Sequence, residues 1–161
     1  MSLIIFLIYL ENYTEFAKTY NISYNITNIW KRGDVWNMKN NYFYAMLSRM
    51  KYINRWGLMR NTRNENLSEH SLEVAFIAHA LGVINNEVFG GDINAERLAV
   101  LGMYHDVTEI ITGDMPTPVK YYSPYIRNAY KEVEQVANEQ MLSGLPEVLR
   151  ARYEGLLLET E

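Results

Sequence analysis

The sequence predicts an all-α body preceded by an irregular arm. From Asn41 onward apolar residues recur at helical spacing, and no pair of segments alternates with the period of two that is typical of strands. Proline occurs only at positions 116, 118, 124 and 146, so the long segments before and between carry no helix breaker. The 161 residues, 48% hydrophobic and 21% charged, fit one globular domain.

The N-terminal segment differs in composition from the rest. The apolar run from Leu3 to Leu10 is far shorter than the roughly 20 residues that span a bilayer, and it lacks the features of a signal peptide. We expect it to form a strand or helix that packs on a partner surface. Residues 11–40 are rich in Asn, Tyr and Thr and are expected to be irregular. The composition changes near Met38, which divides the chain into an arm, 1–37, and a body, 38–161.

Five helices are expected in the body, over about 42–53, 68–86, 95–111, 124–142 and 146–161. Ser68 and Ser123 are plausible N-caps, and Pro124 occupies a first helical position, where its missing N–H costs nothing. The pair Gly90-Gly91 separates the second helix from the third, and Gly113 ends the third. These breaks place the longest apolar helix next to the one that follows it.

The second helix is apolar on two sides. At 100° per residue, Val74, Ile77 and Leu81 lie within about 40° of His70. A second apolar group lies on the opposite side, near His79. A helix that is apolar on two sides is expected at the centre of a fold, with His79 as a hydrogen-bonded core histidine.

Composition excludes several classes of function. The net charge of −4 argues against binding to a nucleic acid polymer or an anionic membrane, because both require concentrated Lys and Arg. The chain has no cysteine, which excludes disulfides, thiol nucleophiles and cysteine-based zinc sites. A metal ion would therefore need His and carboxylate ligands, and the chain contains three histidines.

Two helices carry residues that suit a divalent cation. His70 lies near the start of the second helix, and the pair His105-Asp106 lies toward the end of the third. Gly102, one turn before the pair, leaves room for close helix approach, and Glu109 overhangs the same patch. Two imidazoles and a carboxylate suit a borderline divalent ion, and Glu109 could then move a proton or orient water. The alternatives are a chance His-Asp pair, a core histidine and a solvated glutamate.

Two further segments could contact a phosphorylated substrate. Arg55 can grip a phosphate in fork geometry, and Trp56 offers a flat wall for a sugar or base. The stiff turn at 113–118 follows the third helix and presents Asp114 and Thr117. The alternatives are a surface arginine beside a core tryptophan and a plain helix stop.

Together these motifs resemble the bacterial 5'-deoxynucleotidases of the HD-domain superfamily. The motifs are Arg-Trp, Glu-Asn-x-Ser-Glu-His-Ser, Tyr-His-Asp-x-x-Glu and Thr-Gly-Asp-x-Pro-Thr-Pro, in that order within residues 53–122. The resemblance begins near Met38 and covers about three quarters of the chain. It implies an HD-domain helical bundle, a cytoplasmic homodimer, and metal-dependent hydrolysis of deoxyribonucleoside 5'-monophosphates with cobalt or manganese.

The resemblance also implies roles for individual residues. The implied metal ligands are His70, His105 and Asp106. Glu109 is the implied catalytic residue. Arg55 is implied to contact the phosphate and Trp56 the sugar. Asp114 and Thr117 are implied to make further contacts with the substrate.

The chain departs from the family pattern in two places. The family supplies a further metal-binding Asp, whereas no Asp follows Asp114 in these residues. We therefore expect a weaker site with three protein ligands, and activity that is impaired by the loss. The first 37 residues have no family counterpart and are either translated upstream sequence or an arm that covers apolar surface. The alternatives are an HD hydrolase for another nucleotide, such as a nucleoside triphosphate or guanosine alarmone, and a non-catalytic nucleotide-binding or scaffold protein.

Overall fold

The structure, a computed structural model, describes residues 42–57 and 62–158. Within these residues the chain is helical, and its only strand-like pairing is an isolated antiparallel bridge between Asn54 and Asn66. This confirms the all-α prediction for the described part of the body. The predictions for the apolar run at 3–10 and for the arm lie outside the described residues.

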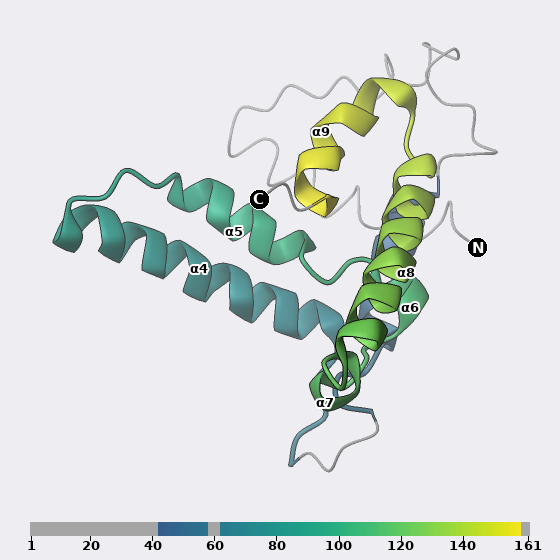
Figure 1. The fold of residues 1–161 in the computed structure, drawn as a ribbon. Helices are drawn as coiled ribbons and strands as arrows, with labels where there is room; N and C mark the ends of the chain where they lie inside the picture. Colours follow the sequence, from purple (N-terminus) through teal and green to yellow (C-terminus); the bar gives the residue numbers. More distant parts are fainter. Residues whose placement is uncertain (1–41, 58–61, 159–161) are drawn as a thin grey trace.

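The second and third predicted helices form an antiparallel pair that projects from the rest of the molecule (Figure 1). They are α4 (Leu67–Phe89) and α5 (Ala95–Tyr104). Asn66 caps α4 by accepting hydrogen bonds from the backbone N–H groups of Ser68 and Glu69, while the Glu69 carboxylate accepts one from the Asn66 N–H. Ser68 is therefore not the N-cap, because the amide two residues earlier satisfies the free N–H groups.

Glycines let α4 and α5 approach closely at two points. A Cβ added at Gly102 would lie 2.9 Å from the Cα of Ala75, and one added at Gly82 would lie 3.0 Å from the Cα of Ala95. Real Cβ atoms essentially never come closer than 3.0 Å to such an atom, so only glycine fits at position 102 without a shift, and position 82 is tighter than most Cβ contacts. This confirms the expected close approach at Gly102, one turn before His105.

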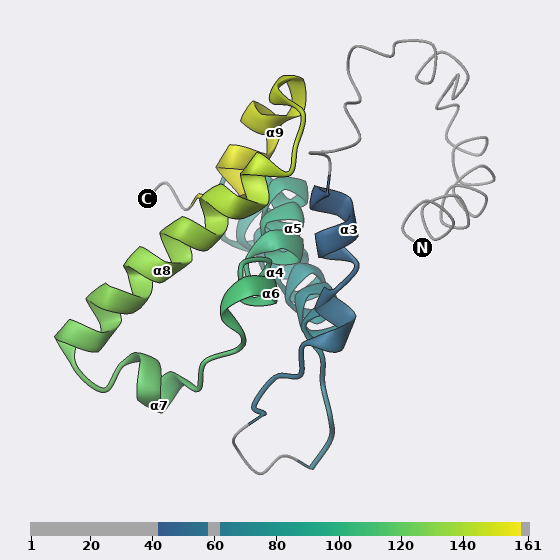
Figure 2. The ribbon, with the colours of Figure 1, turned by 90° about the vertical axis from the view of Figure 1, so that its right-hand side faces the viewer.

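The remaining helices gather at the end of this pair where α4 begins and α5 ends (Figures 1 and 2). The first predicted helix is found as two pieces, α3 (Phe43–Leu47) and a 3₁₀ turn, η1 (Met50–Tyr52). The fourth and fifth are α8 (Pro124–Ser143), capped by the Ser123 hydroxyl, and α9 (Glu147–Leu157), preceded by Pro146. Helix α8 contacts α3 and α9, while η1 contacts α4 and α9 contacts α5.

The predicted single helix over 95–111 is interrupted. Helix α5 ends at Tyr104, the chain turns through residues 105–108, and α6 (Glu109–Thr112) follows. The next segment, expected to be a plain stiff turn, includes α7 (Thr117–Lys120). The interruption matters for function because it places His105 and Asp106 in a turn rather than on a helix face.

The core lies where this turn meets α3, α8 and α9. Its fully buried side chains are Phe43, Leu67, Val107, Met141 and Leu142. Val107 directly follows the His-Asp pair, so burial of its side chain fixes the turn that carries both residues. The core therefore packs against the turn that carries two residues of the candidate site.

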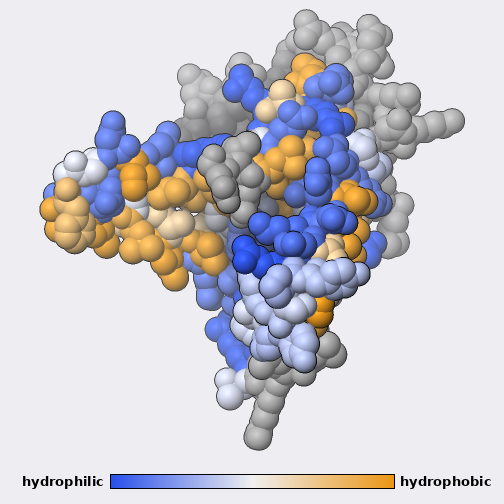
Figure 3. Space-filling model, in the orientation of Figure 1, coloured by the Kyte–Doolittle hydropathy of each residue, from blue (hydrophilic) through white to orange (hydrophobic). Residues whose placement is uncertain are grey.

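The outer side of α4 is exposed and apolar. Hydrophobic side chains, drawn orange in Figure 3, gather along the α4–α5 pair, and Phe76 and Phe89 are 66% and 77% exposed. The expected central position is thus not found in the described structure, and His79 is exposed rather than in the core. By length and composition alone α4 could cross a membrane, which is weak evidence for a membrane span.

Candidate metal centre

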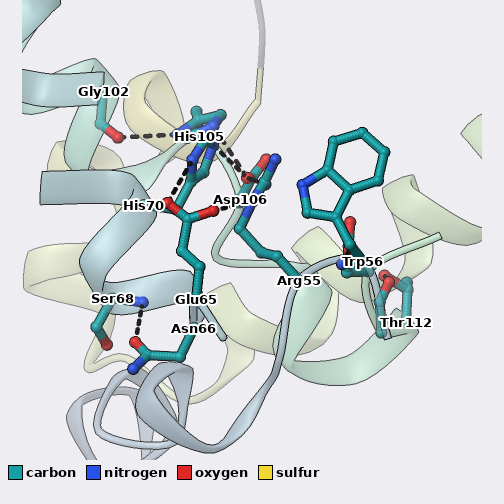
Figure 4. Close-up of polar contacts among 12 residues, drawn as sticks. Arg55, Trp56, Glu65, Asn66, Ser68, His70, Gly102, His105, Asp106 and Thr112 are labelled. Atoms are coloured by element: carbon teal, nitrogen blue, oxygen red, sulfur yellow. Dashed lines mark hydrogen bonds and ion pairs between the residues drawn. The ribbon is translucent and has the colours of Figure 1, made fainter. Parts of the chain in front are cut away.

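Three donor atoms converge where α4 meets the turn after α5 (Figure 4). His70 extends from the second turn of α4, while His105 and Asp106 come from the turn that follows α5. The Oδ2 of Asp106 lies 3.0 Å from the Nε2 of His105 and 3.5 Å from the Nε2 of His70. One ligand atom from each of the three residues lies within 4.8 Å of the other two. The structure therefore brings together the three predicted metal ligands.

The outer nitrogens of the two imidazoles face other partners. The Nδ1 of His105 lies 2.8 Å from the carbonyl oxygen of Gly102. A carbonyl can only accept, so Nδ1 carries the hydrogen and, in the neutral ring, Nε2 keeps its lone pair. The Nδ1 of His70 lies 3.8 Å from the Oε1 of Glu65. Two imidazole nitrogens and one carboxylate oxygen with such outer partners fit a divalent transition-metal ion.

The charge states of His70, His105 and Asp106 depend on one another and on Arg55. Burial, aided by the positive charge of Arg55, lowers the pKa of His70. Burial opposes the charged forms of His105 and Asp106, but the hydrogen bond between them prevails: it raises the pKa of His105 and lowers that of Asp106. The pair therefore favours imidazolium and carboxylate, and a bound cation must displace the imidazolium proton.

Arg55 lies against this cluster, as the motif suggested. Its Nη1 donates a hydrogen bond of 3.2 Å to the Oδ2 of Asp106, and its Nε lies 3.2 Å from the Oε2 of Glu65. Its side chain is only 14% exposed, and the guanidinium stands 5.7 Å from the centre of the Trp56 ring. The alternative that Arg55 is only a surface arginine therefore does not hold.

Trp56 and Asp114 are joined through the backbone. Trp56 has φ = 57°, in the left-handed region that bulky residues rarely adopt, and its N–H donates to the Oδ2 of Asp114. Figure 4 shows the indole standing beside Arg55, on the side away from the histidines. Asp114 therefore contributes to the site indirectly, by accepting the hydrogen bond from the strained Trp56 backbone. Thr117 is exposed, at the start of α7.

Glu109 is the most perturbed carboxyl group in the site. Burial raises its pKa to about 8, and the negative charges of Asp106 and Asp114 act in the same direction. Its Oε2 is buried without a hydrogen-bond partner in the described structure. At neutral pH this carboxyl group is therefore mostly protonated when no cation is bound. The alternative that Glu109 is a solvated glutamate at a helix end does not hold, because its side chain is largely buried.

Sequence reasoning did not single out Glu65 within the site. It lies in the quoted Glu-Asn-x-Ser-Glu-His segment, five residues before His70, so the motif itself was the available signal. Its contact with Arg55 depends on the bridge between Asn54 and Asn66, which the sequence pattern does not reveal. Sequence spacing alone therefore could not place Glu65 between the arginine and the histidine.

A histidine from one helix that meets a His-Asp pair at the end of the next defines the HD-domain class of helical proteins. The fold is similar to that of an HD-domain phosphohydrolase from Listeria innocua, with a TM-score of 0.64 and 28% identity over 71% of this chain and 54% of that one.

The chain belongs to the YfbR-like 5'-deoxynucleotidase family, whose model matches residues 42–161. It is 55% identical over 120 residues to a 5'-deoxynucleotidase of Photorhabdus laumondii, covering 74% of this chain and 61% of the relative. A 5'-deoxynucleotidase of Pectobacterium atrosepticum is also 55% identical, over 74% of this chain and 60% of the relative. The chain thus spans about three fifths of the length of these curated relatives.

Proposed function

We propose that the protein hydrolyses deoxyribonucleoside 5'-monophosphates to nucleoside and inorganic phosphate. Membership of the family and the names of its relatives support this activity. The observation that carries the proposal is the convergence of two Nε2 atoms and one carboxylate oxygen beside the partly buried Arg55. Because the chain spans about three fifths of the length of these relatives, we propose their activity for it rather than state it.

In this proposal His70, His105 and Asp106 hold a divalent transition-metal ion, cobalt or manganese. Such an ion supplies positive charge that polarises a phosphoryl oxygen and lowers the pKa of water. Arg55, next to Asp106, pairs with the remaining phosphate oxygens, for which its forked N–H groups are suited.

Glu109 is proposed to handle the proton. A carboxyl group with a pKa near neutrality can give up or accept a proton at low cost. When water attacks phosphorus, the bond from phosphorus to the 5'-oxygen breaks and that oxygen needs a proton. The raised pKa of Glu109 and its unpartnered buried oxygen support this assignment.

Trp56, Asp114 and Thr117 are proposed to contact the nucleoside. The indole beside Arg55 stands where the sugar follows a phosphate held by the guanidinium, so it would crowd a 2'-hydroxyl group. We expect faster phosphate release from dAMP than from AMP. Equal turnover of the two nucleotides would contradict this role of Trp56.

The proposal is tested by phosphate release from the purified 161-residue chain, with and without Co²⁺ or Mn²⁺. The panel contains deoxyribonucleoside and ribonucleoside monophosphates, nucleoside triphosphates and a guanosine alarmone. Metal-stimulated release from dAMP that is lost in Glu109→Gln and kept in Glu73→Gln, an exposed control on α4, supports it. Preference for another nucleotide would assign a different substrate, and silence under all metals would indicate a non-catalytic binding protein.

We also propose that the protein is a cytoplasmic homodimer. The exposed apolar side of α4, which includes Phe76 and Leu81, supports a contact between copies. Light scattering should give twice the chain mass, and Phe76→Asp should shift the protein toward the monomer. A monomeric wild-type protein at micromolar concentration would contradict the homodimer.

A further inference from the structure

Glu65 faces two groups of the candidate site from outside it. One carboxylate oxygen, Oε1, lies 3.8 Å from the Nδ1 of His70, and the other, Oε2, lies 3.2 Å from the Nε of Arg55. On their other sides both groups reach the same atom, the Oδ2 of Asp106, at 3.5 Å from His70 and 3.2 Å from Arg55. The imidazole and the guanidinium therefore each lie between two carboxylates, and both contacts with Glu65 are electrostatic contacts without hydrogen-bond geometry.

The backbone fixes where Glu65 lies. The Arg55 N–H donates to the Glu65 carbonyl at 2.9 Å, and the Leu67 N–H donates to the Ile53 carbonyl at 3.0 Å. The capping box of α4 begins at the next residue, so Glu65 is set between a paired segment and a helix start. Figure 4 shows its carboxylate directed toward His70 and Arg55. This position is part of the fold rather than a chance surface contact.

The two histidines have matching arrangements. His105 directs Nε2 at Asp106 and is held at Nδ1 by the Gly102 carbonyl. His70 directs Nε2 at the same carboxylate, and the Glu65 carboxylate faces its Nδ1. The 3.8 Å separation is longer than a hydrogen bond, so a direct bond requires the two side chains to move closer than they lie here. An Nδ1–H held in this way leaves Nε2 with the lone pair that a cation requires.

We propose that Glu65 is a positioning residue that orients His70 toward the cation and Arg55 toward the phosphate. The inference rests on the proposed function for its phosphate half, whereas its cation half requires only that the three donors bind a metal. Arg55 and Asp106 already form an ion pair, so loss of Glu65 would free the guanidinium to rotate about its remaining contact. One carboxylate thereby couples the geometry of the cation site to that of the anion site.

The test compares Glu65→Ala, Glu65→Gln and the exposed control Glu73→Gln in the full chain. Co²⁺ affinity is measured by calorimetry and by the visible absorption of bound Co²⁺, and inorganic phosphate is titrated into the Co²⁺-loaded protein. Glu65→Ala should weaken Co²⁺ binding about 10–100-fold and alter the absorption band, as expected when an outer partner of a ligand is lost. Glu65→Gln keeps shape and one acceptor oxygen, so it should restore part of the affinity.

Several outcomes would overturn the inference. Unchanged Co²⁺ affinity and absorption in Glu65→Gln and Glu65→Ala, with helical circular dichroism intact, would reduce Glu65 to a structural role. Unchanged phosphate affinity would remove the Arg55 half. If the wild type binds Co²⁺ but releases no phosphate from dAMP, and Glu65→Ala still loses affinity, the proposed function fails and the cation half stands. If the wild type binds no Co²⁺, both fail.

Discussion

Replacement of Gly102 by alanine should weaken both the fold and the metal centre. The added Cβ would lie 2.9 Å from the Cα and 3.0 Å from the N of Ala75, and ordinary contact begins near 3.4 Å. Both clashing atoms are backbone, so no side chain can move aside, and α4 and α5 must separate by about half an ångström or more. Overpacking of this kind costs about 1–3 kcal/mol. For a chain of this size each kcal/mol lowers Tm by roughly 2–4 °C.

The same separation reaches the site, because His70 lies on α4 and His105 follows α5 directly. We therefore expect Gly102→Ala to weaken Co²⁺ binding as well as to lower Tm. The matched control is Gly155→Ala on α9, where the nearest atom is the flexible end of Arg97 at 3.3 Å. This control should leave Tm unchanged or raise it, because alanine favours helix. Equal Tm and Co²⁺ affinity in wild type and Gly102→Ala would refute the close-packing argument.

Three further predictions follow from the electrostatics and the strain of the site. The pKa of Glu109 is about 8 in the folded protein and near 4.5 in the unfolded chain. The protein without bound metal should therefore lose about 1–2 kcal/mol of its free energy of unfolding as the pH rises from 5 to 8, a figure reduced for the partial exposure of the side chain. Urea titrations should show this loss, and Glu109→Gln should remove it. Because the pKa of His105 is raised above 6.5, Co²⁺ should bind more weakly as the pH falls through that region, and calorimetry in buffers of different ionisation enthalpy should detect proton release; a pH-independent affinity would contradict the imidazolium. Asp114→Ala should raise KM for dAMP several-fold with a smaller change in Co²⁺ affinity, because it removes the acceptor of the Trp56 N–H and leaves the cation ligands in place; an unchanged KM would argue against that role.

The sequence predicts most of the helices because their start signals are local. Ser123 caps α8 with Pro124 at the first position, as the pattern indicates. The break after Tyr104 was missed because residues 105–108 carry neither glycine nor proline, and tertiary burial of Val107 decides their conformation. Periodicity likewise could not reveal that one apolar side of α4 is exposed in the described structure, since that depends on which elements cover it.

The same distinction applies to the candidate site. His70, His105 and Asp106 could be grouped from their residue types and from Gly102, which marks close helix approach. The link from Trp56 to Asp114 could not, because it depends on a left-handed backbone conformation that tryptophan rarely adopts. The site residues that sequence reasoning finds least easily are thus those held by backbone geometry.

Whether His70, His105 and Asp106 together bind a metal ion can be tested by anomalous diffraction from crystals of the chain grown with Co²⁺. We expect one strong peak about 2.0–2.2 Å from the Nε2 of His70, the Nε2 of His105 and the Oδ2 of Asp106. A peak on other residues, or no peak at saturating Co²⁺, would contradict it.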